Sequence, residues 1–317
     1  MKIICITPIK HLDGAYEKLD SMCNLKYLPD INKDELKKIL FEESFTYLFT
    51  NPNKQNFILD KEVLEDSNIK VINTCSTGLN HIDTNYCKEN NIDIWSLKTD
   101  YDLINNLPST SELAFGLMMS LLRNIPKSFH SVKDGNWDYE PYVGHQIKGK
   151  TIGVIGYGRL GKIMCQLFEG WGVKVLVYDP YIWYPLSHPL RKDFLKVDRG
   201  ELLKKSDVVF LHTHVTDDTR DMVDEEFISH MKEGSYLINT ARGELVDEDA
   251  IIDSIKAGHL KGYGTDVIKD EFGDIQNSKL VEFSKENNVI ITPHVGGMTI
   301  EGQTKAYHWA INKFKDM

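Results

Sequence analysis

The chain lacks long apolar runs, has few cysteines and has no excess of positive charge. No uninterrupted apolar stretch in its 317 residues approaches the roughly 18 residues that favour a membrane span. Its five cysteines are scattered, odd in number and without C-x-x-C spacing, which argues against a disulfide framework and indicates reduced thiols. The net charge of −10 disfavours nucleic acid or an anionic membrane as the main partner.

Targeting signals and repeats are also missing. The N-terminal segment Met1–Thr7 is too short for a signal peptide and is typical of a buried first strand. We therefore expect a cytoplasmic protein, and 317 residues suffice for two compact domains or one large one.

A glycine-rich motif stands out in the middle of the chain. The apolar run from Thr151 to Ile155 leads into G-Y-G-R-L-G over 156–161, and helical spacing of apolar residues follows from Arg159 to Gly170. A second apolar run, Val173–Tyr178, ends at Asp179, 18 positions past the last glycine. This order is typical of a strand, turn and helix that bind a dinucleotide pyrophosphate, with the carboxylate on the ribose hydroxyls. It predicts NAD rather than NADP, held by Tyr157, Gly158, Arg159, Leu160 and Asp179.

Four further polar residues suggest the chemistry. Arg242 and His294 each follow an apolar run, and Asp266 and Glu271 lie between them. An Arg offers a two-donor fork for the carboxylate and carbonyl oxygen of a 2-oxo acid, and a His can protonate that oxygen. A Glu beside the His would raise its pKa so that the proton is available near neutral pH. Taken singly, each also fits a solvated surface residue, but a hydride source and a proton source together favour a dehydrogenase.

An ordered series of motifs extends over nearly the whole chain. It comprises Ser76–Asp83 (S-T-G-L-N-H-I-D), Ser111–Ala114, Gly135–Trp137, Gly149–Gly153, the glycine loop, Leu211–His212, Asn239–Asp247 (N-T-A-R-G-E-L-V-D), Asp266–Val267 and Thr292–His294. In this series the chain resembles the NAD-dependent D-isomer-specific 2-hydroxyacid dehydrogenases.

The resemblance implies roles for individual residues. Arg242 would bind substrate, His294 would be the general acid/base and Glu271 its partner. The backbone amides of Ser76, Thr77 and Gly78 would bind the substrate carboxylate. Asp266 would hold the nicotinamide carboxamide. The remaining contacts to the cofactor would come from His212, Thr240, Ala241 and His294.

Three positions depart from the family pattern. His214 stands where the family usually has Pro, Thr74 stands where phosphoglycerate-type members usually have Arg, and Ile268-Lys269 replaces an aromatic residue followed by Glu. The second departure favours a small unphosphorylated substrate. The third leaves the assignment of Glu271 dependent on its spacing from Asp266.

The alternation of apolar runs with polar helical stretches predicts an α/β fold of two doubly wound parallel-sheet domains. We expect a Rossmann-type NAD domain over 104–294, inserted into a flavodoxin-like substrate domain over 1–103 and 295–317, with an interdomain cleft. An apolar helix over 105–123 and a helix over 298–315 would connect them. In the family the segment matching 125–147, which contains Phe129, Trp137, Tyr139 and Tyr142, embraces a second subunit, so we expect a homodimer.

Other interpretations remain open. A formate dehydrogenase-like relative is disfavoured because formate has no carbonyl to protonate. A dinucleotide-sensing binding protein, similar to the corepressors that share this fold, would keep the same motifs. His212 and His214 alternate on an expected strand, but no third ligand accompanies them, so we predict no metal site.

Overall fold

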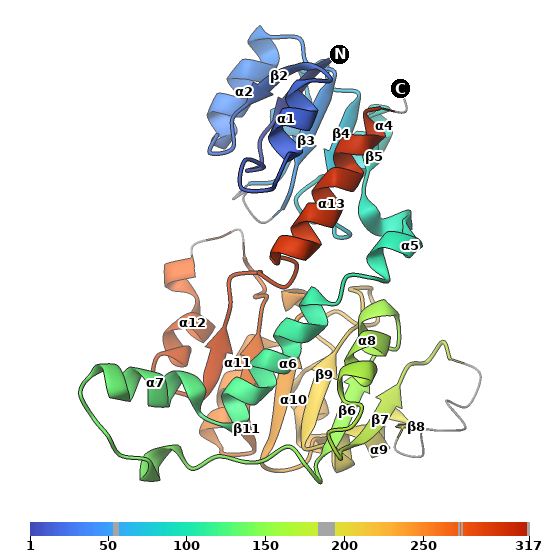
Figure 1. Ribbon diagram of the computed structural model, residues 1–317. Coiled ribbons are helices and arrows are strands. Elements are labelled where there is room, and N and C mark those ends of the chain that lie inside the picture. The colour runs from blue at the N-terminus through green and yellow to red at the C-terminus, as the bar shows by residue number, and fades with distance from the viewer. Residues whose placement is uncertain (53–56, 183–193, 272, 274, 316–317) are drawn as a thin grey trace. The chain divides into compact units, whose positions relative to one another are not determined.

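The computed structural model describes residues 1–52, 57–182, 194–271, 273 and 275–315. The chain divides into two compact units (Figure 1): unit 1 comprises Met1–Leu107 and Gly297–Met317, and unit 2 comprises Pro108–Gly296. The first boundary between the units follows residue 107, four residues after the expected boundary. The second boundary follows residue 296, two residues after the expected one. In the described ranges no helix is long and apolar enough to cross a membrane.

Unit 1 is built on a five-stranded parallel sheet with the order β2-β1-β3-β4-β5. This is the flavodoxin-like order, in which the first two strands are swapped at one edge. The strands are β1 (Lys2–Cys5), β2 (Asn24–Tyr27), β3 (Tyr47–Thr50), β4 (Val71–Thr74) and β5 (Asp93–Trp95).

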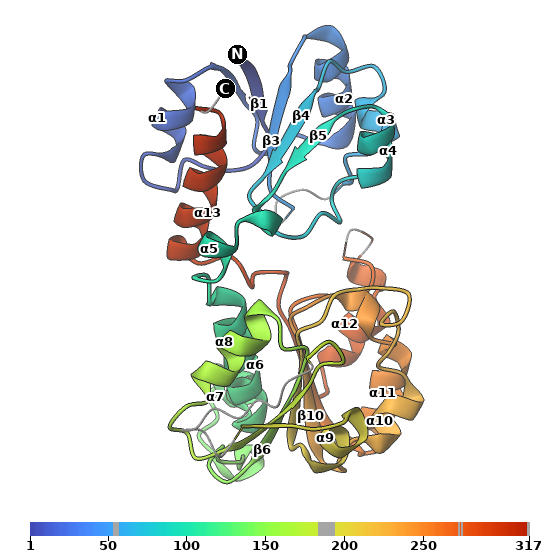
Figure 2. The ribbon, with the colours of Figure 1, turned by 90° about the vertical axis from the view of Figure 1, so that its right-hand side faces the viewer.

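Helices cover both faces of this sheet (Figure 2). Successive strand residues point to opposite faces, so Ile3 and Cys5 share one core cluster with α1 (Ala15–Asp20) and α13 (Ile300–Lys313). Ile4, between them, belongs to the cluster on the other face. The elements that contribute to that second cluster are α2 (Lys33–Glu42), α3 (Lys61–Leu64) and α4 (Thr84–Glu89). Two short helices, η1 (Leu97–Thr99) and α5 (Tyr101–Ile104), complete the unit.

Unit 2 contains a seven-stranded parallel sheet with the order β12-β11-β10-β9-β6-β7-β8. Counted from the first strand of the unit, this is the Rossmann order, which reverses direction between β6 and β9. The strands are β6 (Thr151–Ile155), β7 (Lys174–Tyr178), β8 (Phe194–Lys196), β9 (Val208–Leu211), β10 (Ser235–Asn239), β11 (Leu260–Thr265) and β12 (Val289–Ile291). The predicted pair of parallel-sheet α/β domains is confirmed.

Two helical layers enclose the sheet of unit 2. One apolar cluster joins the sheet to α6 (Ser109–Leu122) and α8 (Arg159–Leu167). A second joins the other face to α9 (Arg199–Lys205), α10 (Glu225–His230), α11 (Glu248–Lys256) and α12 (Lys279–Ser284). The remaining described helices are α7 (Ile125–Lys133), η2 (Glu140–Tyr142), η3 (Gly243–Leu245) and η4 (Ile275–Asn277).

Three helices are shorter than the sequence suggested, and the one expected over 298–315 is α13, which covers only Ile300–Lys313. The expected helix over 105–123 begins only at Ser109, because Pro108 has no N–H to donate and stands at the N-cap. The helix expected to reach Gly170 ends at Leu167, and Gly170 and Gly172 then adopt positive φ values of 80° and 67°. Such left-handed backbone terminates a helix and favours glycine.

The segment from α7 to Val143 packs poorly on unit 2. In Figure 1, α7 and the following loop extend away from the sheet, and no residue of α7 is buried. Exposed fractions reach 59% for Phe129, 92% for Trp137 and 79% for Tyr139. Exposed apolar side chains on one segment are the feature expected where a second subunit would bind.

Candidate active site

The predicted site residues of unit 2 lie at one edge of its sheet. In parallel strands all carboxyl ends meet at the same edge, where doubly wound sheets bind their ligands. The segments that begin there contain Gly156–Leu160, which includes the start of α8, after β6, Asp179 after β7, His212 after β9, Thr240–Arg242 after β10, Asp266 after β11 and His294 after β12.

The three glycines of the turn after β6 have separate geometric roles. Gly156 has a φ of 92°, and a Cβ there would overlap the carbonyl oxygen of His212. A Cβ at Gly161 would overlap the carbonyl oxygen of Gly156, so this glycine allows α8 to approach the strand. At Gly158 no described atom lies within 4 Å of an added Cβ. The turn therefore leaves room for a pyrophosphate at the start of α8.

Asp179 is fixed by two backbone amides. One carboxylate oxygen accepts from the amide of Tyr157, at 2.8 Å, and the other accepts from the amide of Tyr181, at 2.9 Å. The first contact joins the end of β7 to the glycine turn. The negative charge thus lies beside the proposed pyrophosphate turn, where the adenosine ribose of a dinucleotide would be bound.

His212 and Thr240 have buried polar atoms without a partner. Neither ring nitrogen of His212, nor the hydroxyl of Thr240, makes a hydrogen bond within the described part of the chain. Buried polar atoms are normally paired, so unpaired ones at a ligand edge are the signature expected of a site that a polar ligand completes. Together with the open space at Gly158, they fit a dinucleotide bound across β6, β9 and β10.

The two histidines after β9 do not alternate on a strand, which corrects the expectation from sequence. β9 ends at Leu211, because the apolar run that the sheet core requires stops there. His212 stacks on Phe210 with ring planes 7° apart, whereas His214 is exposed. No group of three or more His, Cys, Asp or Glu side chains among the described residues could hold a metal ion.

Burial, with a smaller contribution from Arg159, lowers the pKa of His212 from 6.5 to about 4. The unfolded chain then binds a proton between these values and the folded chain does not, so stability falls as pH falls through this window. Between pH 7.5 and 5 this costs wild type about 2 kcal/mol. We expect His212→Gln to lose that much less stability over the same interval. Urea unfolding of both proteins at pH 7.5 and 5 measures the free energies of unfolding. An equal loss of stability in wild type and His212→Gln would contradict the lowered pKa of His212.

Asn239 shapes the turn that presents Arg242. Its side-chain amide donates to the carbonyl of Arg242 at 2.8 Å, and its side-chain oxygen accepts from the amide of Ala241 at 3.0 Å. A Cβ at Gly243 would overlap the backbone of Ile268, so the turn packs directly on the segment that precedes Glu271. The sequence pointed to Arg242, but it did not predict that the Asn239 side chain holds the turn that presents Arg242.

Asp266 organises the loop that contains His294. Its carboxylate accepts from the Thr292 hydroxyl at 2.5 Å and from the amides of Val295 at 2.9 Å and Gly296 at 2.7 Å. Burial raises its pKa, and these three hydrogen bonds oppose that rise. The contact of Asp266 to the nicotinamide stays a prediction, whereas its support of this loop was not predicted from the sequence.

His294 and Glu271 are in direct contact. Nδ1 of His294 lies 2.8 Å from Oε2 of Glu271, although the residues that usually precede this Glu are replaced by Ile268-Lys269. His294 has a φ of 52°, a left-handed conformation that is uncommon outside glycine. Its backbone amide donates to the carbonyl oxygens of Asp266 and Thr292, both at 2.9 Å, which holds that conformation.

The predicted carboxylate-binding residues Ser76, Thr77 and Gly78 belong to unit 1, in the turn after β4. Within the described ranges the backbone amides from Ser76 to Leu79 donate to no protein acceptor. Successive unpaired amides in a turn form a suitable anion-binding surface. Thr74, immediately before this turn, is fully buried and its hydroxyl is hydrogen-bonded to Ser76 and His81.

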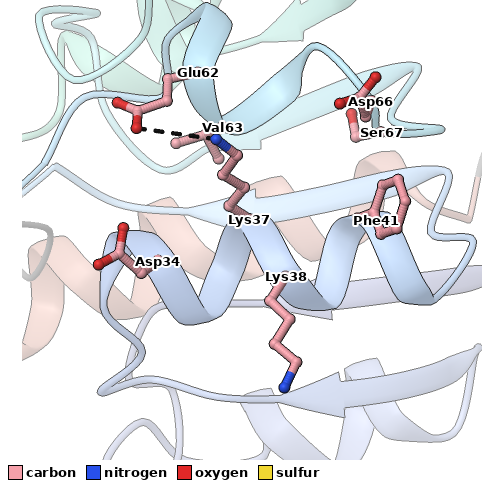
Figure 3. A pocket seen from close by; sticks show the side chains of 8 residues that line it. All are labelled: Asp34, Lys37, Lys38, Phe41, Glu62, Val63, Asp66 and Ser67. Carbon is pink, nitrogen blue, oxygen red and sulfur yellow. Dashed lines mark ion pairs between the residues drawn. The ribbon is translucent and has the colours of Figure 1, made fainter.

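A surface groove of about 350 Å³ lies on unit 1 between α2 and α3 (Figure 3). Lysines and carboxylates line it together with the exposed ring of Phe41, and Lys37 pairs with Glu62 at 4.0 Å. None of the predicted site residues borders this groove, so we assign it no part in the chemistry.

Comparison with known proteins identifies the family. Residues 115–296 match the model of the D-isomer specific 2-hydroxyacid dehydrogenase NAD binding domain. A hydroxypyruvate reductase of Thermotoga maritima is 32% identical over 289 residues, which cover 90% of this chain and 89% of that protein. A D-3-phosphoglycerate dehydrogenase of Methanocaldococcus jannaschii is 29% identical over 96% of this chain, but the match spans only 55% of that longer protein.

Among solved structures, the D-lactate dehydrogenase of Aquifex aeolicus, complexed with NAD and lactic acid, superposes with a TM-score of 0.79. It is 29% identical, and the match covers 99% of this chain and 94% of that one. The predictions of family, enzyme class and NAD as cofactor are confirmed. The chain belongs to the D-isomer specific 2-hydroxyacid dehydrogenases, a family of NAD-dependent oxidoreductases.

Proposed function

We propose that this protein reduces a small unphosphorylated 2-oxo acid to the D-2-hydroxy acid with NADH, and catalyses the reverse oxidation when NAD is in excess. The observation that supports this most strongly is the contact between His294 and Glu271 at the edge of the sheet that also bears Arg242. β10 and β12 are separated by β11 alone. Their ends therefore lie roughly 10 Å apart, a span that an Arg and a His can bridge around one small substrate.

In this proposal the reduced nicotinamide, when bound, supplies a hydride to C2 of the oxo acid. Arg242 holds the carboxylate and the carbonyl oxygen through its planar fork, which orients the carbonyl. As electrons shift from the C=O bond to oxygen, His294 gives that oxygen a proton from Nε2. Glu271 accepts a hydrogen bond from Nδ1–H, with 2.8 Å between nitrogen and oxygen, and so fixes the ring with Nε2 facing away from the carboxylate.

The proposed cofactor contacts follow the same edge. Tyr157 to Leu160 would surround the pyrophosphate and Asp179 the adenosine ribose. The buried polar atoms of His212 and Thr240 would be paired by the nicotinamide side of the cofactor, as their lack of partners within the described part of the chain suggests. Ala241 would line this side, and the carboxylate of Asp266 would accept from the carboxamide.

A substrate panel tests this function. Purified protein with NADH is assayed against glyoxylate, pyruvate, hydroxypyruvate and larger 2-oxo acids, and against formate with NAD. Turnover of at least one small 2-oxo acid supports the proposal. NADH binding without turnover of any of them would instead favour a dinucleotide-sensing protein, and formate oxidation alone would favour a formate dehydrogenase.

We expect unphosphorylated acids to be preferred. Thr74 is buried and uncharged where phosphoglycerate-type relatives usually have Arg, so a phosphate would lose a charge-assisted contact worth about 1.5 to 3 kcal/mol. The kcat/KM for hydroxypyruvate should exceed that for 3-phosphohydroxypyruvate by roughly ten- to a hundred-fold. Steady-state kinetics with this pair measure the ratio, and a higher value for the phosphorylated acid would show that another cation replaces the missing Arg.

We also propose that the protein is a homodimer through the segment 125–143. Its exposed Phe129, Trp137 and Tyr139 support an interface, and the resemblance to the family implies a second copy of this chain as the partner. Light scattering on wild type and on Trp137→Asp would measure the mass of each. The cytoplasmic location remains a prediction from the sequence.

A further inference from the structure

A chain of hydrogen bonds lies beneath the turn that follows β4. The hydroxyl oxygens of Thr74 and Ser76 are 2.9 Å apart, and Nε2 of His81 is 3.1 Å from the Thr74 hydroxyl. The Ser76 hydroxyl donates to the carbonyl of Gly78 at 2.7 Å. Thr74 and His81 have no exposed surface, whereas residues 76 to 79 are half-buried. The chain therefore runs from a buried His to the half-buried turn.

Counting protons fixes the direction of this chain. A carbonyl oxygen only accepts, so the single proton of Ser76 lies toward Gly78. The Thr74 hydroxyl must then donate to Ser76, and it can only accept from His81. His81 consequently holds a proton on Nε2, and each group donates to the next in the order His81, Thr74, Ser76, Gly78.

This direction determines where the backbone amides of the turn point. The described peptide bonds are all trans, and in a trans peptide the C=O and N–H of one unit point in opposite directions. Holding the Gly78 carbonyl toward Ser76 therefore turns the Leu79 amide away from the chain. Ser76 is also fixed from the other side, since its carbonyl accepts from the amide of Leu97 at 3.0 Å.

The backbone of His81 ties the other end of the turn to a neighbouring segment. Its carbonyl accepts from the amide of Leu59 at 2.9 Å, and Leu59 forms a parallel bridge with Ile82. The ends of the turn are thus held by backbone hydrogen bonds, which include one from the amide of Ile82 to the carbonyl of Leu79 at 3.0 Å. Between them, the Gly78 carbonyl is held by the Ser76 hydroxyl at the end of the His81–Thr74–Ser76 chain. Removing Thr74 or His81 would leave a buried polar group unpaired. It would also weaken or remove the donor that fixes the Ser76 hydroxyl, and so loosen the hold of Ser76 on the Gly78 carbonyl.

We propose that Thr74 and His81 are positioning residues for substrate binding: they orient the amides of the turn 76–79 so that these amides can bind the substrate carboxylate. The inference depends on the proposed function, because it assumes that this turn binds a carboxylate. Neither residue needs to touch the substrate. At the position where phosphoglycerate-type relatives usually have Arg, Thr74 would then serve to position the turn 76–79.

The test compares Thr74→Val, which keeps the shape but loses the hydroxyl, with Thr74→Ser, which keeps the hydroxyl. His81→Gln retains an N–H donor and His81→Leu does not. The matched control is Thr7→Val, because Thr7 is equally buried in unit 1 and its hydroxyl pairs with Tyr307 at 3.0 Å. For each variant we would measure the Tm, the Kd of NADH, the Kd of oxamate with NADH bound, and KM and kcat for the best 2-oxo acid.

We expect Thr74→Val and His81→Leu to raise KM and the Kd of oxamate by roughly ten-fold or more, with the Kd of NADH unchanged. Thr74→Ser should stay close to wild type and His81→Gln should lie between. Thr7→Val should lower the Tm by a similar amount but leave KM unchanged. If Thr74→Val does not fold, the KM and the Kd of oxamate of His81→Gln and His81→Leu are compared instead. A larger rise in His81→Leu supports the positioning role, and equal values contradict it.

Two results would overturn the inference, and they are distinguishable. An active wild type whose Thr74→Val variant has an unchanged KM, or a KM that rises no more than that of Thr7→Val, contradicts the positioning role alone. A wild type that reduces no 2-oxo acid and binds no oxamate contradicts the proposed function, and the inference with it.

Discussion

Replacing His294 with asparagine should lower kcat by roughly 10²- to 10⁴-fold, because the side chain that protonates the carbonyl oxygen is lost. Asparagine is smaller than His, but its side-chain amide keeps an N–H donor near the place of Nδ1 and still can hydrogen-bond Glu271, so the Kd of NADH should change little. The hydrogen bonds of the His294 backbone amide to Asp266 and Thr292 should persist. Single-turnover reduction, followed by NADH absorbance, separates the chemical step from product release.

The matched control for this variant is His230→Asn. His230 is an exposed residue of α10 whose ring bonds the carbonyl of Glu226, on the helical layer of unit 2. We expect His230→Asn to retain wild-type kcat. A His294→Asn enzyme that keeps more than about a tenth of wild-type kcat would contradict the assignment of the proton donor.

Cofactor choice should depend on Asp179. Its carboxylate is held beside the glycine turn by the amides of Tyr157 and Tyr181, and it should repel the additional phosphate of NADPH. We expect kcat/KM for NADH to exceed that for NADPH by a factor on the order of 100 or more, equivalent to about 2.7 kcal/mol. Asp179→Asn removes the negative charge and should lower the ratio of kcat/KM for NADH to kcat/KM for NADPH.

Asp207→Asn is the matched control, because it also removes a carboxylate charge that is hydrogen-bonded to a backbone amide. The Asp207 carboxylate accepts from the Thr151 amide at 2.8 Å, but it stands before β9, at the amino edge of the same sheet. Its substitution should affect stability and leave the cofactor ratio unchanged. Equal specificity constants for NADH and NADPH in wild type would refute the role of Asp179.

The sequence was informative where function depends on short-range order. Apolar runs located Asp179, Arg242 and His294 near strand ends, because each of these residues follows its run within four positions. The spacing of glycines located the turn after β6. Glu271 was placed by its spacing from Asp266 despite the unusual Ile268-Lys269, and its carboxylate does contact His294.

Long-range side-chain hydrogen bonds were not predicted. Asp266 supports a loop 26 to 30 residues further along the chain, and no local pattern shows which donors a buried carboxylate will meet. The chain from His81 to Ser76 spans few residues, but it forms only because the end of β4 is buried, a fact that depends on the packing of unit 1. The prediction that His212 and His214 alternate on a strand was wrong, because the strand ends with the apolar run at Leu211 and both histidines follow it.

The central claim is hydride transfer from NADH to C2 of a 2-oxo acid, with D stereochemistry. It is tested most directly by reducing glyoxylate, pyruvate and hydroxypyruvate with NADH that is deuterated on the transferred face at C4 of the nicotinamide. We expect one deuterium at C2 of the hydroxy acid product, a product of D configuration where C2 is chiral, and the same reaction slowed by roughly 10²- to 10⁴-fold in His294→Asn. A product without deuterium, a product of L configuration, or undiminished transfer in His294→Asn would contradict it.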